Sequence, residues 1–210
     1  MISTRFIKIH LPVILSGLIP IFRLLYLALY TDDGLGANPI ELITRSTGTW
    51  ALVFLCMTLS ISPLRRIFGF SRLQKHRRTL GLLMFFYALC HFSIWFWLDH
   101  NLNFLEMFQD VYKRPFITAG FITFLLTVPL ALSSNQWAIK KLKKRWTSLH
   151  QLIYVIAVLA ILHFFWHKAG KNDFVVVGIY ASIIMVLLGY RVSEKFKFHT
   201  NGLHIKRFIK

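Results

Sequence analysis

The chain has 210 residues, of which 56% are hydrophobic and 16% charged, and its mean hydropathy is +0.56. This composition excludes an ordinary soluble globular domain. A formal net charge of +17 would suggest nucleic-acid binding in a soluble protein, but these charges cluster between apolar segments, so membrane lipid is expected as the surroundings and nucleic acid is not.

Apolar segments recur along almost the whole chain, each roughly as long as the 20 residues that a helix needs to cross the hydrocarbon of a bilayer. We therefore predict an all-α membrane protein, a bundle of about six transmembrane helices forming one domain over residues 1–210. The helices are expected at residues 10–30, 46–62, 80–98, 116–133, 148–167 and 174–190. The connections between them leave no room for a soluble domain.

Turn and proline signals set several of these limits. The turn at residues 46–48 is expected to begin the second helix, and Pro63 to end it, because proline disfavours helical backbone at the preceding residue. Pro115 suits the first turn of the fourth helix, where its missing N–H costs nothing. Pro129 should kink that helix.

The basic residues alternate between the two ends of the predicted bundle. Nineteen of the 25 Lys and Arg fall in four segments, residues 1–10, 63–80, 134–148 and 191–210. Seven of the eight acidic residues fall in the three segments between them. The positive-inside rule then predicts both termini in the cytoplasm and a multi-pass protein of the bacterial inner membrane.

Three histidines lie inside predicted spans, where an ionisable group calls for a functional hypothesis. His91 lies roughly 12 Å from the outer end of its helix, and His163 roughly 7 Å from the outer end of the fifth. The two rings can therefore meet at one depth. Paired imidazoles from adjacent helices are the ligands of a six-coordinate heme in a helical bundle.

His150 stands apart from this pair, thirteen residues before His163. On an ideal helix that spacing turns the two rings about 140° apart. His150 is thus expected to serve a different heme or a different face of one site, unless the helix is not ideal. Arg77 lies fourteen residues before His91, roughly on its face, and is a candidate to hold a heme propionate through its guanidinium. An ordinary positive-inside role for Arg77 is about equally consistent.

Six stretches along the chain carry a family resemblance. They are GLGANPIELITRSTGTWAL (34–52), SPLRR (62–66), RRTLGLLMFFYALCHF (77–92), RPFITAG (114–120), ALSSNQ (131–136) and KRWTSLHQLIYVIAVLAILHFFW (144–166). In this order they resemble the heme-binding membrane subunits of MsrPQ protein-methionine-sulfoxide reductase systems, within the ferric-reductase-like transmembrane group. The family's histidines match His91, His150 and His163.

The resemblance implies a b-type cytochrome with one or two hemes b, and FMN as a further cofactor. It implies an electron donor at the cytoplasmic side, a quinone or a flavin reductase. It also implies a periplasmic molybdopterin-containing (MsrP-like) partner subunit, which reduces methionine sulfoxide in oxidised proteins. Sulfoxide reduction itself is expected on that partner, because nothing in this chain resembles a molybdenum or nucleotide-binding segment.

Two other functions remain open at this point. A transmembrane ferric or metal reductase would pass electrons to a small external acceptor. A proton-coupled transporter would use the intramembrane histidines as a relay, and would be expected to show interrupted helices and acidic residues at mid-membrane, which the sequence does not clearly show.

Overall fold

The computed structural model describes the backbone of residues 4–31, 33–170 and 172–207, and side chains within residues 8–31, 33–170 and 172–195. These parts of the chain are helices joined by short turns. In order they are α1 (Thr4–Tyr30), α2 (Pro39–Phe68), η1 (Ser71–His76), α3 (Arg77–Ile94), η2 (Trp95–Asp99), α4 (Phe104–Lys113), α5 (Pro115–Leu132), α6 (Gln136–Leu142), α7 (Lys144–His150), α8 (Leu152–Ala169) and α9 (Val175–Arg207).

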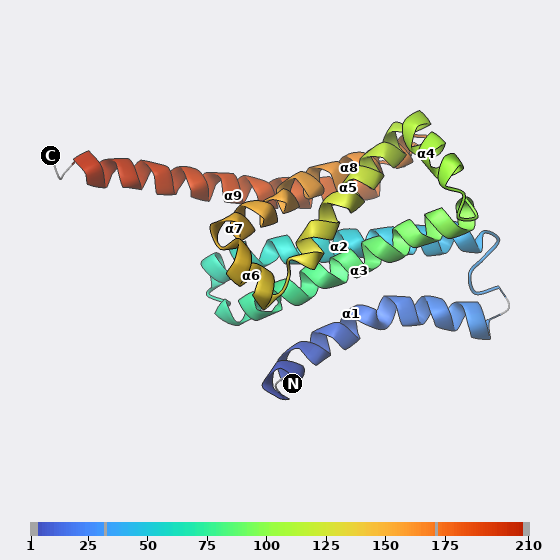
Figure 1. Ribbon diagram of the computed structural model, residues 1–210, viewed down its shortest axis with the longest axis horizontal. Helices are drawn as coiled ribbons and strands as arrows, with labels where there is room; N and C mark the ends of the chain where they lie inside the picture. Colours follow the sequence, from blue (N-terminus) through green and yellow to red (C-terminus); the bar gives the residue numbers. More distant parts are fainter. Residues whose placement is uncertain (1–3, 32, 171, 208–210) are drawn as a thin grey trace.

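The prediction of six membrane helices is confirmed. Six helical segments are long and apolar enough to cross a bilayer, namely Lys8–Tyr30, Pro39–Phe68, Ser71–Asp99, Pro115–Leu132, Lys144–Ala169 and Val175–Lys195. The short helix α4 lies at one end of the bundle, and α6 and α7 lie at the opposite end, where most of the basic residues also fall (Figure 1). We call these the acidic end and the basic end.

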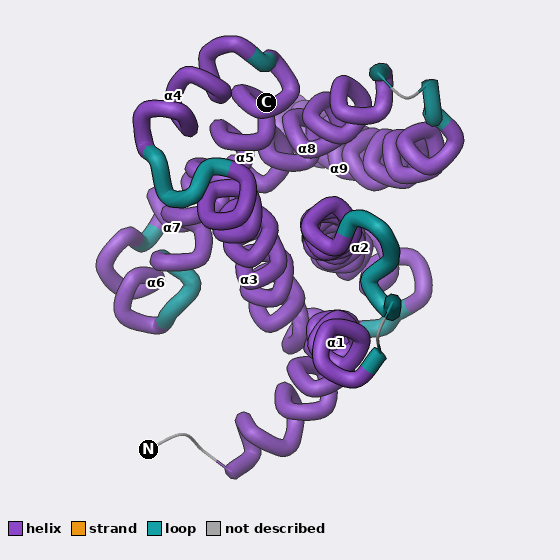
Figure 2. The backbone as a smooth tube through the Cα atoms, turned by 90° about the vertical axis from the view of Figure 1, so that its right-hand side faces the viewer, coloured by secondary structure: helices purple, strands orange, loops and turns teal. Residues whose placement is uncertain are grey.

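Two helix pairs form the centre of the bundle. Helix α2 packs along α3, and α5 packs along α8, while contacts between α3 and α5 join the pairs. Helix α1 packs mainly on α3, and α9 covers α8 and α2. The view along the bundle shows α1 on one side of the α2/α3 pair and α8 and α9 on the other (Figure 2).

Aromatic side chains fill the contacts between these pairs. Tyr87 of α3 is fully buried and stacks on Phe54 of α2, and its hydroxyl donates a hydrogen bond of 2.8 Å to the carbonyl of Gly17 in α1. Between the pairs, the rings of Phe92 and Phe124 stack with their centroids 4.4 Å apart. These contacts fix the positions of α3 and α5 relative to their neighbours.

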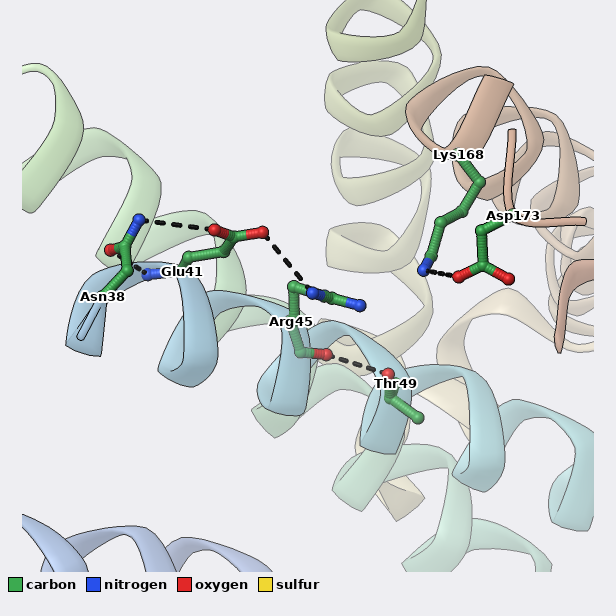
Figure 3. Close-up of polar contacts among 6 residues, drawn as sticks. All are labelled: Asn38, Glu41, Arg45, Thr49, Lys168 and Asp173. Atoms are coloured by element: carbon green, nitrogen blue, oxygen red, sulfur yellow. Dashed lines mark hydrogen bonds and ion pairs between the residues drawn. The ribbon is translucent and has the colours of Figure 1, made fainter. Parts of the chain in front are cut away.

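The prediction that α2 begins at residues 46–48 is wrong, because the helix begins at Pro39. Asn38 caps it by accepting a hydrogen bond from the N–H of Glu41, and its amide nitrogen donates to the Glu41 carboxylate (Figure 3). Pro39 suits the first helical position, since that N–H has no partner within a helix. Gly48 therefore lies inside the helix rather than at its start.

The prediction that Pro63 ends α2 is also wrong, because the helix continues to Phe68 and is capped by Gly69 at φ 71°. A proline inside a helix leaves the carbonyl four residues earlier without its usual N–H partner. That carbonyl belongs to Leu59, and Arg191 of α9 donates to it at 2.7 Å. A distant side chain thus replaces the missing hydrogen bond and lets the helix pass through the proline.

The segment between the third and fourth predicted spans was expected to be a loop, but it contains the short helix α4. Asn103 caps this helix by accepting hydrogen bonds from the N–H groups of Leu105 and Glu106. Phe104, Leu105 and Phe108 are exposed along it. A helix of ten residues is too short to cross a bilayer, so its apolar side chains suit the membrane interface.

Candidate functional site

His91 of α3 and His163 of α8 lie opposite each other where the two helix pairs meet. Their ring centroids are 6.1 Å apart, and the ring planes cross at 76°. The structure therefore brings together the two histidines that depth alone paired in the sequence. Both lie nearer the acidic end, because α3 ends at Ile94, soon after His91, and α8 ends at Ala169, soon after His163.

Each histidine ring is hydrogen-bonded to a backbone carbonyl of the helix that packs beside its own, α2 for His91 and α5 for His163. Nδ1 of His91 lies 2.9 Å from the carbonyl oxygen of Thr44, and Nδ1 of His163 lies 2.7 Å from that of Phe116. A carbonyl can only accept, so each Nδ1 carries the proton and donates it. In a neutral ring Nε2 then carries a free lone pair. No group of the described residues is hydrogen-bonded to Nε2 of either ring.

Two glycines give these rings the space that they occupy. A Cβ atom built on Gly48 of α2 would lie 3.0 Å from Nδ1 and Cε1 of His91, and one built on Gly120 of α5 would lie 2.7 Å from Nδ1 of His163. Each glycine follows the accepting carbonyl by four residues, one helical turn. The two helix pairs thus hold their histidines in the same way.

The sequence analysis missed both glycines as site residues. A signal was present, since each is a glycine inside a long apolar helix, where it costs about 1 kcal/mol relative to alanine and calls for a packing or functional reason. The backbone carbonyls of Thr44 and Phe116 that accept from the two rings give no signal in the sequence. Both carbonyl-to-histidine pairs are separated by 47 residues.

Several polar contacts form within the first turns of α2, around Thr44. Glu41, held by the Asn38 cap, accepts a hydrogen bond from Arg45 at 3.4 Å, and the carbonyl of Arg45 accepts one from the Thr49 hydroxyl (Figure 3). The Thr47 hydroxyl donates to the Thr44 carbonyl that also holds His91. The Thr44 hydroxyl oxygen is buried and has no partner in the described chain.

This donor set fits heme. A metal–imidazole bond is about 2 Å long, so two such bonds together with the ring radii span close to the observed separation of the centroids. The two neutral rings are oriented by backbone carbonyls, as metal-binding histidines generally are. Within the described residues no three His, Cys, Asp or Glu side chains gather as a metal site would require, which disfavours zinc.

His150 lies apart from this pair, at the basic end, as its spacing predicted. It ends α7, and α8 begins two residues later, so the expected single helix is interrupted at Gln151. Its ring stacks on Trp146 at 4.0 Å, and its Nε2 lies 3.0 Å from the Ser133 hydroxyl oxygen. Ligation of iron through Nε2 requires this contact with Ser133 to open.

Arg77 begins α3 at the basic end, and its charge acts on His150. It therefore lies close to one of the predicted heme histidines. His76, the residue before Arg77, packs edge-on against the ring of His10 in α1, with centroids 5.6 Å apart. The structure thus separates Arg77 and His150 from the His91/His163 pair by most of the length of α8.

An ion pair between a buried lysine and a partly exposed carboxylate lies just beyond His163, at the end of α8. The side chain of Lys168 is only 6% exposed, and its Nζ donates to the carboxylate of Asp173 in the turn before α9 (Figure 3). The hydrogen bond from Lys168, followed by its positive charge, lowers the pKa of Asp173 below its usual value of 3.8. The pair therefore ties the α8–α9 turn to the helix that carries His163.

This ion pair predicts an acid-dependent stability. A carboxyl whose pKa is lowered by folding stabilises the folded state above its unfolded pKa, and that contribution is lost as the pH falls through the lowered pKa. We expect the thermal midpoint in detergent to fall more steeply below about pH 4 in the wild type than in Asp173→Asn. Equal pH profiles for the two proteins would contradict this role for the pair.

Comparison with known proteins finds relatives that match most of the chain. Residues 47–161 match the model of the ferric reductase like transmembrane component. A protein of Bordetella pertussis is 52% identical over 85% of both chains, and one of Ralstonia nicotianae is 50% identical over 88% of this chain and 84% of its own. Both are named protein-methionine-sulfoxide reductase heme-binding subunit MsrQ. No solved structure matches the chain.

Proposed function

Because the chain belongs to the ferric-reductase-like transmembrane family and, within it, to the MsrQ heme-binding subunits, we propose that it is a b-type cytochrome that carries electrons across the inner membrane. The observation that carries this proposal is the facing pair His91 and His163, 6.1 Å apart in a multi-pass bundle. Bound heme supplies an iron that gains and loses one electron at a time, at a potential set by its ligands and surroundings.

The residues around this pair orient it rather than react. The carbonyls of Thr44 and Phe116 hold the protons at Nδ1, which leaves Nε2 of each ring as the nitrogen that can bind a metal. Gly48 and Gly120 allow the rings to lie against the helix backbone. The packed aromatic side chains of Phe92 and Phe124 fill the contact between α3 and α5, which keeps the surroundings of the pair apolar.

The proposed direction of electron transfer rests on the charge asymmetry, which orients the bundle, and on the family resemblance. By the positive-inside rule the basic end faces the cytoplasm, where a quinone or a flavin reductase would supply electrons. The His91/His163 pair then lies toward the periplasm. A periplasmic molybdopterin-containing (MsrP-like) subunit would accept electrons there and reduce methionine sulfoxide. FMN is proposed as a further cofactor, as the family resemblance implies.

His150 and Arg77 are proposed to serve a second heme at the basic end. The imidazole would supply the ligand, and the Arg77 guanidinium would neutralise a propionate. If so, His150→Ala lowers extracted heme from about two to about one per chain and leaves the spectrum of the remaining heme unchanged. Ser133→Ala, which removes the hydroxyl beside Nε2, is the matched control and retains both. Unchanged heme content in His150→Ala would remove this residue from the ligand set.

Transfer can be tested in liposomes that contain the heme-loaded protein. NADH and a flavin reductase are enclosed, and ferricyanide, which does not cross the bilayer, is the outer acceptor. We expect ferricyanide reduction that His91→Ala abolishes. Reduction no faster than in protein-free liposomes would contradict the proposal. Replacing ferricyanide by ferric citrate or by the purified molybdopterin subunit with a methionine sulfoxide distinguishes a ferric reductase from a sulfoxide-reductase subunit.

A further inference from the structure

A polar cavity of about 420 Å³ lies at the basic end of the bundle. Helices α2, α3, α8 and α9 each contribute to its wall. The basic side chains that line it, other than Arg66, are Arg65, Arg77, Arg191 and Lys195, together with the hydroxyl groups of Tyr154 and Tyr190. Of these groups the proposed function uses only Arg77, to neutralise a propionate of the second heme.

Within the described residues, most of the positive charge that lines this cavity has no carboxylate partner. Its one acidic lining residue, Glu194, is paired with Arg66. No carboxylate of the described chain forms an ion pair with Arg65, Arg77, Arg191 or Lys195. Arg77 lies close enough to Arg191 and Arg65 for their like charges to act on it. Such a group of cations is unfavourable in a partly enclosed space unless an anion joins it.

Arg191 is held in a fixed position at the wall. Its Nη2 donates to the Leu59 carbonyl that Pro63 leaves without a helical partner, and its Nη1 donates to the Tyr154 hydroxyl at 3.1 Å. The guanidinium also lies over the Tyr154 ring, 5.3 Å from its centroid. Its Nε is buried and has no partner among the described residues. The side chain is therefore ordered before any ligand arrives, and one donor remains unused.

The chemistry of a phosphate group matches the three cations that the proposed function does not use, Arg65, Arg191 and Lys195, together with the two tyrosine hydroxyls. Phosphate offers several anionic oxygens, which guanidinium groups bind through paired hydrogen bonds. A single carboxylate would leave most of this charge unbalanced. The volume suits a head group and excludes a nucleic-acid helix. We propose that this cavity binds the phosphate of a small ligand, either a soluble phosphate monoester or a phospholipid head group, at the end of the bundle that contains His150.

The experiment compares two probes that differ only in phosphate. FMN and riboflavin are titrated by flavin fluorescence into the purified, heme-loaded protein, and retention of phosphatidylglycerol is measured by native mass spectrometry. Arg65→Gln combined with Lys195→Gln removes two exposed cavity cations. Lys140→Gln combined with Lys144→Gln removes the same charge from exposed residues at the same end, outside the cavity.

A phosphate monoester site predicts that FMN binds, that riboflavin does not, and that the cavity double variant weakens FMN binding at least about tenfold while the control does not. A lipid site predicts no FMN binding and loss of retained phosphatidylglycerol in the cavity variant alone. The proposal is overturned if both double variants behave like the wild type, if both lose binding equally, or if the cavity variant loses heme instead. Phosphate binding in a protein that holds no heme would sustain this inference while overturning the proposed function.

Discussion

We expect that replacing His91 or His163 with Ala removes the heme proposed to lie between α3 and α8, and that the proposed transmembrane electron transfer is lost with it. Either change deletes one of the two facing imidazoles that would hold the iron. Extracted heme should fall by about one equivalent per chain. The polypeptide should still insert, because one imidazole contributes little to the apolar length of either span.

His100→Ala is the matched control, since His100 lies at the acidic end and pairs with Asp110 rather than with either site histidine. It should retain full heme content and an unchanged absorption spectrum. Full heme content in His91→Ala or in His163→Ala would show that the assignment of ligands is wrong.

Gly120→Ala is expected to weaken heme binding although it leaves every proposed ligand in place. The new Cβ would lie 2.7 Å from Nδ1 and 2.8 Å from Cε1 of His163, well inside van der Waals contact. The ring must shift and lose its hydrogen bond to the Phe116 carbonyl. Overpacking of this kind costs about 1–3 kcal/mol, which corresponds to roughly 5- to 150-fold weaker heme retention. Heme loss to apomyoglobin measures this directly.

Two further glycine substitutions are expected to weaken heme retention less than Gly120→Ala. Gly48→Ala should weaken heme retention less, because its Cβ would approach the His91 ring only to 3.0 Å. Gly178→Ala in α9 meets no atom within 4 Å and should match the wild type. If Gly120→Ala retains heme as firmly as Gly178→Ala, the glycine has no part in positioning the ring.

The six spans were predictable because hydrophobic length and charge asymmetry are local properties of the sequence. The errors in α2 come from contacts that local patterns do not contain. Pro63 does not end the helix, because Arg191 satisfies the freed carbonyl of Leu59 from 132 positions away. The true start of α2 has a local sequence signal, since Asn38, Pro39 and Glu41 form a capping sequence. The turn-forming residues around Gly48 give a competing signal, which favoured the later start.

The sequence predicted the part of the site that side chains form, but not the part that the backbone forms. Intramembrane histidines are rare and costly, and depth along two helices was enough to pair His91 with His163. The carbonyls that orient the rings could not be predicted, because any residue supplies one and the contact depends on how the helices pack. The hydrogen bond between His150 and Ser133 likewise depends on the packing of α5 against α7.

The most direct test of the account is the reduced-minus-oxidised absorption spectrum of the purified, detergent-solubilised protein, measured together with extracted heme per polypeptide. The account predicts a sharp α-band of a low-spin, six-coordinate b-type heme and one or two hemes per chain. A well-folded protein that remains free of heme when expressed with ample heme would contradict it, and would favour a proton-coupled role for the intramembrane histidines.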